Sequence, residues 1–289
     1  MQKYNFIKLI YFKWKLFTAK IINLLFVVYE TSQSRLFTKR KIKILFSKKT
    51  DWQHPIKRGF YATRHEIGFD ELSYKNIKDY DLIVPLTIDD LKYLNEARHL
   101  LFNNPIPIPR IETILLCDDK YALNQKLIEN GFGSIVPKMG DGLSYPYILK
   151  KSIDDWGRNC HIIENKQQEL IYSDKSINPN YFSQELIVGQ YEYAMHILFK
   201  DNNILCSINI EYFFEIETPI KGKDKEIYQK ICRQRYLDTF TSILISIGFE
   251  GLCCINYKVR DNRPFIIEIN PRFGGSLSPY FFSFMRLIE

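Results

Sequence analysis

Oxygen-bearing side chains with the spacing of a metal site lie near the C-terminus of the sequence. Glu268 and Asn270 are two positions apart in a predicted strand, so both side chains leave it on the same face. The preceding strand carries Asn256 and connects through a turn at residues 260–262, so its amide can reach that face. A few hard oxygen ligands suit a Mg²⁺ ion that also binds water and phosphate. Arg272 adds a guanidinium fork for phosphate, so the stretch predicts half of a magnesium-nucleotide site.

The strand that carries Glu268 is apolar on both sides, which is typical of a buried strand. Its neighbours include Phe265, Ile266, Ile267 and Ile269. A buried glutamate needs a charged partner or a metal ion, because an isolated buried charge is costly. The alternative is the solvated polar face of a half-exposed sheet, and the apolar neighbours argue against it.

Length and composition indicate a folded protein with substantial cores. The chain has 289 residues, of which 46% are hydrophobic and 15% aromatic, enough for two or three subdomains. Its six cysteines show no Cys-x-x-Cys spacing and lie mostly among apolar residues. We expect buried thiols in a reducing compartment, which favours the cytoplasm.

The formal net charge of +7 is unevenly distributed along the chain. Residues 1–60 carry 14 Lys or Arg against 2 acidic residues, whereas the other 229 residues carry 26 against 31. The basic character therefore belongs to the N-terminal segment. Since the sequence also has no Cys/His finger and no aromatic-basic RNA motif, we expect no nucleic-acid partner.

An apolar arm interrupted by lysines is predicted at residues 1–40. Its longest uncharged run, residues 21–29, is far short of the roughly 20 residues that a spanning helix needs. One interpretation is a helix on an anionic membrane surface, as a peripheral contact. The other is a helical hairpin packed on the next domain. The hairpin is favoured because, at 100° per residue, the lysines fall on two separated stripes instead of one polar face.

Residues 41–110 predict a small α/β domain with a parallel sheet. Strands are expected at residues 42–46 and 81–86, and a helix at residues 89–101. The proline-rich residues 103–109 connect this domain to the rest of the chain and predict a boundary near residue 110.

Residues 267–272, Ile-Glu-Ile-Asn-Pro-Arg, resemble the signature of the ATP-grasp superfamily, in the version of carbamoyl phosphate synthetase and the small carboxylate-amine ligases. Together with further segments in the family's order, the resemblance covers residues 118–276. It implies an α+β fold of two lobes that grip ATP, preceded by the small parallel-sheet α/β domain. The implied ATP-grasp domain is residues 111–289, with lobes at about 111–183 and 184–289 and a helix from about 223 to 247.

Two lysines are expected at the nucleotide phosphates on this resemblance. Lys120 stands in the first turn of a helix that Asp118 would cap, where a lysine opposes the helix dipole. Lys150 ends a predicted strand at residues 145–150. The loop 151–159 departs from the family, because it keeps one glycine and adds two aspartates. Either its basic residues compensate, or the aspartates bind a cationic substrate, or the loop is impaired.

The resemblance implies a hinge between the lobes that binds the adenine. Its backbone groups and apolar side chains would hold the ring, and the residues are Gln184, Glu185, Leu186 and Ile187. Glu192 matches the acidic residue that holds the ribose in the family.

The reaction implied by the resemblance is ATP-driven ligation of a small-molecule carboxylate and an amine. The carboxylate would attack the γ-phosphate to give an acyl phosphate, and the amine would then form an amide or peptide-like bond. Lys150 and Arg272 are the predicted catalytic residues. The predicted ligands of Mg²⁺, with Mn²⁺ as an alternative ion, are Asn256, Glu268 and Asn270. Many relatives carry a carboxylate at the position of Asn256, so we expect a weaker second metal position.

Two other functions stay open. The glycine-poor loop also suits an ATP-binding protein without ligase activity, such as a small-molecule kinase or a regulatory subunit. The basic arm suits a membrane-associated modifier of a surface glycan or peptide. The ordered motifs favour the ligase, and the sequence predicts no particular oligomeric state.

Overall fold

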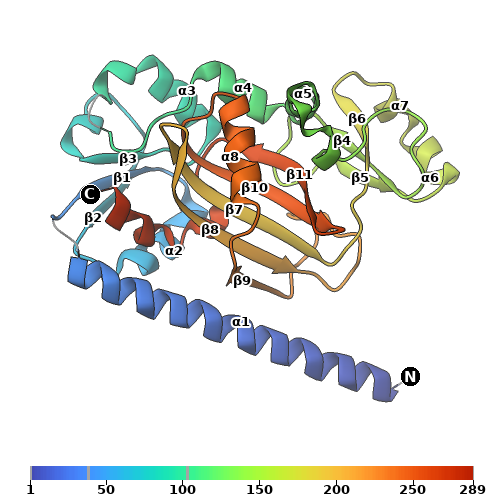
Figure 1. The fold of residues 1–289 in the computed structure, drawn as a ribbon, viewed down its shortest axis with the longest axis horizontal. Helices are drawn as coiled ribbons and strands as arrows, with labels where there is room; N and C mark the ends of the chain where they lie inside the picture. The colour runs from blue at the N-terminus through green and yellow to red at the C-terminus, as the bar shows by residue number, and fades with distance from the viewer. Residues whose placement is uncertain (1, 38–39, 102–103, 289) are drawn as a thin grey trace.

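The computed structural model of the protein describes residues 2–37, 40–101 and 104–288. These residues form one parallel and two antiparallel sheets with helices packed on them (Figure 1). The mixed α/β architecture confirms the fold class predicted from the sequence. Within the described ranges, no helix combines the length and the apolar character that crossing a bilayer would take.

The N-terminal sheet is parallel, with the strand order β2-β1-β3. Its strands are β1 (Lys43–Ser47), β2 (Glu66–Asp70) and β3 (Leu82–Val84), accompanied by α2 (Thr50–Phe60) and α3 (Ile88–Glu96). Thr87 caps α3 in a reciprocal arrangement, because its hydroxyl accepts from the Asp90 backbone N–H while the Asp90 carboxylate accepts from the Thr87 backbone.

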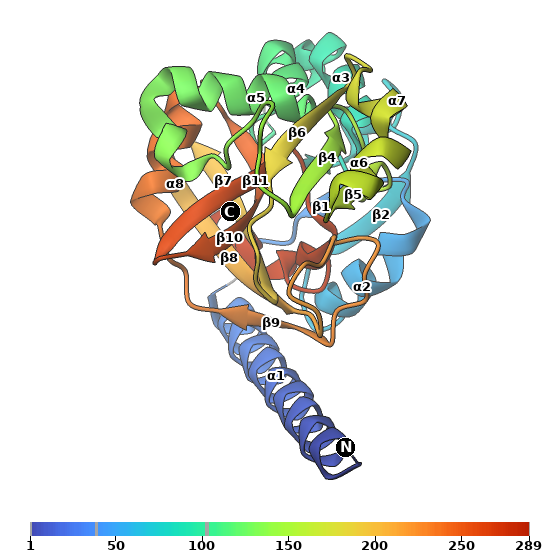
Figure 2. The same ribbon diagram turned by 90° about the vertical axis from the view of Figure 1, so that its right-hand side faces the viewer.

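The remaining strands form the two antiparallel sheets, which Figure 2 shows beside each other. The smaller sheet, in the order β5-β4-β6, consists of β4 (Tyr147–Lys151), β5 (Cys160–Ile163) and β6 (Tyr181–Glu185). The larger sheet, in the order β11-β10-β7-β8-β9, consists of β7 (Tyr191–Lys200), β8 (Asn203–Phe213), β9 (Tyr228–Cys232), β10 (Gly251–Arg260) and β11 (Arg263–Asn270). The other helices are α4 (Ile111–Asp118), α5 (Lys120–Leu127), α6 (Lys166–Ile171), α7 (Ser173–Ser176) and α8 (Leu237–Ser246).

Alternating side chains give the larger sheet two apolar faces. One face packs under α4, α5 and α8, in a core that includes Ile255 and Phe240. The other face contributes Ile210 and Leu252 to a second core, which it shares with Phe46 of the N-terminal sheet. The N-terminal sheet is therefore fixed directly on the larger sheet.

The N-terminal arm is one helix, α1 (Gln2–Phe37), that lies along β9 and the C-terminal segment. The Asn23 amide donates to the carbonyl oxygen of Gln229 and its oxygen accepts from the backbone N–H of Ile231, each at 2.9 Å. Phe26 packs edge-on against Tyr280 with ring centroids 5.8 Å apart. The predicted hairpin is wrong, because the first 54 residues contain no Gly or Pro that would favour a turn.

The predicted helix from about residue 223 to 247 is wrong over its first half. Residues 228–232 form the edge strand β9, and α8 begins only at Leu237. β9 pairs with β8, with Tyr212 opposite Gln229. This long-range pairing overrides the local spacing from which the helix was predicted.

β2 and α2 are elements that the sequence analysis did not predict. Pro55 lies inside α2, where a proline argues against a helix. The buried side chains Trp52, Ile56 and Phe60 nevertheless have helical spacing, and this signal could have identified α2.

Gly251, where β10 begins, is expected to be intolerant of any side chain. Its φ is +111°, and a Cβ atom there would lie 2.4 Å from the carbonyl oxygen of Pro107. We expect Gly251→Ala to lower the free energy of unfolding by about 2–4 kcal/mol in urea denaturation, from the strained φ and the clash together. Gly248→Ala is the matched control, because its φ is +60° and no atom lies within 4 Å of the added Cβ. Equal losses in the two variants would show that the contact with Pro107 contributes nothing.

Candidate active site

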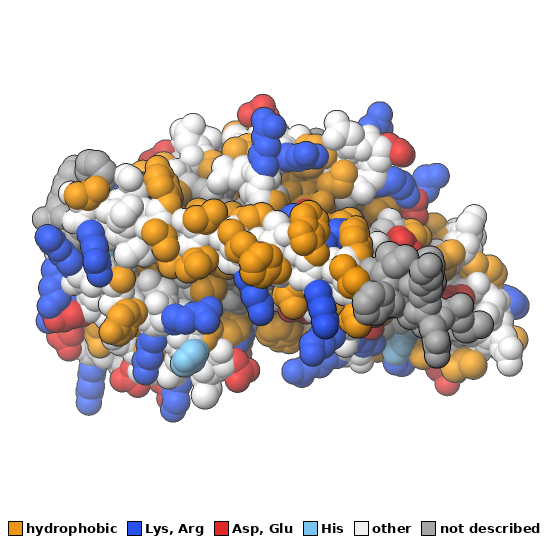
Figure 3. Space-filling view, turned by 90° about the horizontal axis from the view of Figure 1, so that it is seen from below, with side chains coloured by type: hydrophobic (Ala, Val, Ile, Leu, Met, Phe, Trp, Pro, Cys, Tyr) orange, Lys and Arg blue, Asp and Glu red, His pale blue; other side chains and the backbone are white. Residues whose placement is uncertain are grey.

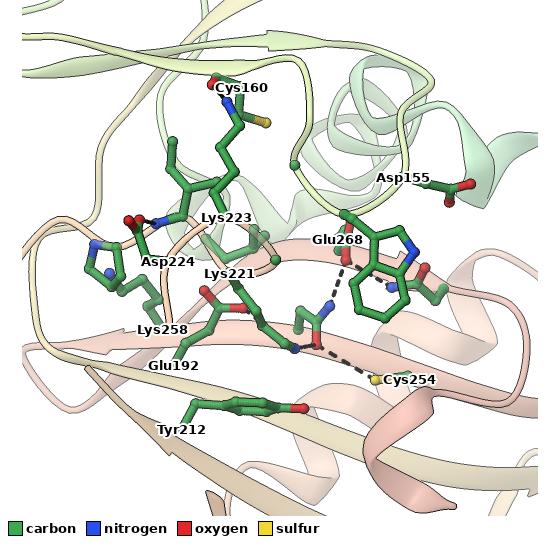
Figure 4. A pocket seen from close by; sticks show the side chains of 18 of the residues that line it. Asp155, Cys160, Glu192, Tyr212, Lys221, Lys223, Asp224, Cys254, Lys258 and Glu268 are labelled. Atoms are coloured by element: carbon green, nitrogen blue, oxygen red, sulfur yellow. Dashed lines mark hydrogen bonds and ion pairs between the residues drawn. The ribbon is translucent and has the colours of Figure 1, made fainter. Parts of the chain in front are cut away.

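A cavity of about 570 Å³ lies between the two antiparallel sheets. Its lining comes from β4, β10 and β11, from the segment after β6, and from two loops, residues 152–159 and 214–227 (Figure 4). Gln184, one of eleven predicted site residues, is fully buried and does not line it. The ten predicted residues that do line it are Lys120, Lys150, Glu185, Leu186, Ile187, Glu192, Asn256, Glu268, Asn270 and Arg272.

A β-bulge in β11 directs two consecutive side chains at the cavity. Asn256 on β10 pairs with Glu268, but the next pair is Tyr257 with Ile266, so Ile267 is the extra residue. Ile267 and Glu268 both line the cavity, whereas Ile266 is buried in the core under α8. Strict alternation would place Ile266 on the same face as Glu268, so the bulge decides which apolar side chain enters the site.

The Glu268 carboxylate is the centre of a polar cluster. Its Oε1 accepts from Nδ2 of Asn256 at 2.6 Å and from Nδ2 of Asn270 at 2.9 Å, and Nζ of Lys120 lies 3.6 Å from its Oε2. Burial favours the neutral acid, but the charge of Lys120 and the amide hydrogen bonds outweigh it and lower the pKa of Glu268 to about 2. The carboxylate is therefore ionised at neutral pH.

The donor set of this cluster fits a hard divalent cation. A carboxylate and two amide side chains lie close together on β10 and β11. Both amides donate through Nδ2 to Glu268, and Oδ1 of Asn256 accepts from Lys221, so the amides would have to turn to offer their oxygens to an ion. In the described part of the chain, no group of three or more His, Cys, Asp or Glu side chains converges as metal ligands do. An ion at Glu268 would thus depend on amide and phosphate oxygens, which Mg²⁺ accepts.

Lys150 extends from β4 of the smaller sheet into the cavity. Its side chain is almost completely buried, and Nζ donates to Oε1 of Gln184 at 2.8 Å. Burial lowers the pKa of Lys150, and the positive charge of Lys120 acts in the same direction, while Cys160 and Glu268 oppose it. Gln184 therefore orients the lysine from behind the cavity wall.

Lys120 is the first residue of α5 and connects that helix to the 152–159 loop. Asp119 caps the helix, accepting from the backbone N–H groups of Tyr121 and Ala122 at 3.0 Å each, so the predicted cap at Asp118 is wrong by one residue. Nζ of Lys120 donates to the carbonyl oxygen of Asp154 at 2.6 Å.

The two aspartates of the 152–159 loop have different surroundings. The Asp154 carboxylate accepts from the backbone N–H of Asn159 at 2.9 Å and from its side-chain Nδ2 at 2.8 Å, which closes the loop on itself. Asp155 is exposed, with Oδ1 3.9 Å from Nη2 of Arg272. Asp154 is thus engaged inside the loop, whereas the Asp155 carboxylate lies beside Arg272 and is open to solvent.

The 214–227 loop packs directly against the 152–159 loop. A Cβ atom added to Gly222, whose φ is +95°, would lie 2.4 Å from the carbonyl oxygen of Trp156. Nζ of Lys223 donates to the carbonyl oxygen of Cys160 at 2.5 Å. The two loops therefore lie against each other and together form one wall of the cavity, which we call its roof. Figure 4 shows Lys223 of the second loop reaching Cys160, directly after the first loop.

Lys221, which was not among the predicted site residues, lines the cavity and is labelled near the middle of Figure 4. Its Nζ donates to Oδ1 of Asn256 at 2.8 Å, and it lies 3.6 Å from Oε1 of Glu192 and 4.2 Å from the ring centroid of Tyr212. Burial opposes the charge, but Tyr212 and Glu192 outweigh it and raise the pKa of Lys221. The Pro-Ile-Lys-Gly sequence at 219–222 is a turn signal that could have placed this lysine on a loop.

Lys258 is a second missed residue, two positions after Asn256 and hence on the same face of β10. It is 4% exposed and lines the cavity, and its Nζ has no hydrogen-bond partner among the described residues. Burial lowers the pKa of Lys258, while the carboxylates of Glu192 and Glu217 oppose the shift. A buried ammonium group without an acceptor is costly, and it points to a ligand that supplies one.

The predicted hinge residues 185–187 form one apolar end of the cavity. Leu186 and Ile187 line it together with Ile148 and Ile267. The Glu185 carboxylate is turned to Arg260 in an ion pair and accepts from the backbone N–H of Lys138 at 3.3 Å. Aliphatic walls of this kind suit a flat ring.

A family model described as an ATP-grasp domain matches residues 117–276. A comparison with curated proteins finds no match. Solved structures of similar fold include an L-amino acid ligase from Bacillus licheniformis, with a TM-score of 0.59 and 14% identity over 84% of this chain and 70% of that chain. A D-alanine–D-alanine ligase from Bacillus anthracis has a TM-score of 0.56 and 14% identity over 86% and 95% of the two chains. A phosphoribosylamine–glycine ligase from Thermotoga maritima has a TM-score of 0.62 and 15% identity over 82% and 71%. At these identities the likeness is one of fold.

The stabilising contribution of the Glu268 charge is expected to disappear in acid. Because the pKa is lowered from 4.5 to about 2, the contribution is complete above about pH 4.5 and is lost as the pH falls to about 2. The difference in unfolding free energy between the native chain and Glu268→Gln should shrink by up to about 3 kcal/mol over this range. Urea denaturation of both proteins at several pH values measures it, and a difference independent of pH would contradict the ion cluster.

Proposed function

Because the chain belongs to the ATP-grasp family, we propose that it is an ATP-dependent ligase that joins a carboxylate to an amine. The observation that carries the proposal is that Lys120, Lys150 and Arg272 line the same cavity as Glu268. These residues come from segments far apart in the sequence. The ligases of similar fold support the reaction class, and the basic arm supports a surface glycan or peptide as a larger acceptor.

ATP would bind with its adenine against Leu186 and Ile187 and with its phosphates toward Lys120 and Lys150. These two ammonium groups neutralise phosphate charge and hold the γ-phosphate in position. Mg²⁺ would be held by Glu268 and its two amide neighbours, and when bound it supplies charge neutralisation at the phosphates.

Arg272 is placed to orient the substrate carboxylate. Its guanidinium carbon lies 5.8 Å from the ring centroid of Trp52, and its Nη2 lies 3.9 Å from Asp155. A carboxylate oxygen would attack the γ-phosphorus while the bond to ADP breaks, and the amine would then displace phosphate from the acyl carbon. The protein supplies position and charge for both steps, and the roof formed by the two loops keeps water from the acyl phosphate.

Removing the Lys150 ammonium is expected to abolish turnover without unfolding the protein. In the proposed reaction, ADP release requires both a carboxylate and an amine, so pools of the two are screened together and separately. Lys150→Ala should lower the rate by at least about 100-fold, because a phosphate contact is lost at the reacting centre. Lys151→Ala is the matched control, since this neighbouring lysine does not line the cavity.

The outcomes separate the candidate functions. ADP release with one acceptor alone would identify a small-molecule kinase, and ATP binding without turnover would identify a regulatory protein. Equal rates of ADP release for Lys150→Ala and Lys151→Ala would show that this cavity is not the active site.

Lys258 is expected to contact the nucleotide at the ribose, near Glu192. Both side chains are buried and line the cavity, and Lys258 has no acceptor among the described residues. Lys258→Met should raise the free energy of unfolding of the ligand-free protein by about 1–3 kcal/mol, because it removes an unpaired buried charge. The same variant should bind ADP at least about tenfold more weakly. Urea denaturation measures the free energy of unfolding, and calorimetric titration measures ADP binding. A variant that is both more stable and binds ADP more tightly, or that is both less stable and binds ADP more weakly, would contradict this role.

A further inference from the structure

The outward face of α1 is an apolar surface without a partner in the described chain. Eleven of its large apolar side chains are between 40% and 73% exposed. Six of them repeat at intervals of three and four residues: Ile10, Trp14, Phe17, Ile21, Leu24 and Val28. Figure 3, which views the molecule from the side of α1, shows this band in orange with basic side chains at its edges. A continuous apolar surface of this kind marks an interaction site.

The inner face of the same helix already holds it on the protein. Phe12 packs against Phe213 with ring centroids 5.8 Å apart, and Ala19 is buried beside it. Asn23 bonds to the edge of β9, and Glu30 lies 3.5 Å from Arg286. The outer band is therefore not required for packing this helix, and its apolar character needs another cause.

The basic side chains of α1 are divided between its two faces. Nζ of Lys15 is turned inward, where it donates to the Tyr191 hydroxyl at 2.6 Å and lies 4.1 Å from the ring centroid of Phe213. Lys13 and Lys20 are exposed, and at 100° per residue they follow one edge of the apolar band. The two lysine stripes that argued against a membrane helix thus differ in their surroundings, because Lys15 on one of them faces the protein, whereas Lys13 and Lys20 on the other are exposed.

We propose that α1 docks its outward face on an anionic lipid bilayer and lies parallel to the membrane surface. The apolar band would enter the boundary between headgroups and acyl chains, and Lys13 and Lys20 would meet the anionic headgroups. Helices of this type combine Trp, Phe and Leu with basic residues. The proposal goes beyond the ligase reaction and does not depend on it.

The charge of α1 and the width of its apolar band favour a bilayer as the partner over a second copy of the chain. The sequence of α1 carries six basic residues and one acidic residue, so two copies of this helix face to face would repel each other. Glu30 is the one acid in the sequence of α1, and it is turned inward toward Arg286. The band is also wider than a coiled-coil seam, since Leu25 and Tyr29 extend it to one side.

The test is co-sedimentation of the full chain with vesicles of phosphatidylcholine alone or mixed with phosphatidylserine. We expect binding to the mixed vesicles that weakens at high salt, and much less binding to the neutral ones. Phe17→Asp with Leu24→Asp should weaken binding at least about tenfold. The matched control is Ile171→Asp with Ile177→Asp, which alters side chains that are 68% and 83% exposed elsewhere on the surface. All these variants lie away from the proposed active site, and circular dichroism with urea denaturation reports that each is folded.

Two further measurements test whether the outward face of α1 is the part of the protein that binds the vesicles. Lys13→Gln with Lys20→Gln should weaken binding to the mixed vesicles by roughly tenfold or more and leave binding to neutral vesicles unchanged. The emission of Trp14, isolated by comparison with Trp14→Phe, should shift to the blue on binding. Equal sedimentation of Phe17→Asp with Leu24→Asp and the native chain would overturn the proposal. So would a native dimer in sedimentation velocity that this pair of substitutions dissolves while vesicles bind neither protein.

Discussion

The site depends on the cost of taking one negative charge partly out of water. The Glu268 side chain is 26% exposed, and its charge is stabilised mainly by Lys120 and by the amides of Asn256 and Asn270. These partners come from the start of α5 and from two strands, so the cluster forms only when those elements are assembled. Lys120 also bonds to the carbonyl oxygen of Asp154, which links the charge to the position of the 152–159 loop. The same lysine therefore compensates the charge of Glu268 and holds the 152–159 loop over the cavity.

The larger sheet separates stability from chemistry by the direction of its side chains. On β10, Ile255 and Tyr257 enter the core under α8, while Asn256 and Lys258 line the cavity. On β11 the bulge at Ile267 produces a similar separation. It turns the Ile267 side chain toward the cavity and leaves Ile266 in the core. Neighbouring residues can thus serve different purposes, and a change of register by one residue would exchange them.

Local signals in the sequence were sufficient for the parts of the site that lie on regular strands. Alternation correctly brings Glu268 and Asn270 together, and Lys150 lies on its predicted strand, one residue before the strand ends at Lys151. Lys221 was missed because it precedes the helix predicted from about residue 223, in a segment for which no element was expected, whereas the chain there forms a loop and then pairs with β8. Lys258 was missed because its significance lies in a missing acceptor, which only the packed structure reveals. Both residues were missed for the same physical reason. Strand pairing and the burial of a charged side chain depend on residues that are far away in the sequence.

The hydrogen bonds of Asn23 have a consequence for the integrity of the larger sheet. β9 is one of its two edge strands, and an edge strand with free backbone groups is a template to which another chain can add a strand. One amide side chain of α1 occupies both a donor and an acceptor of that strand, at Ile231 and Gln229. A fragment that starts after residue 40 would lose both hydrogen bonds, and its β9 edge would be free to pair with another chain.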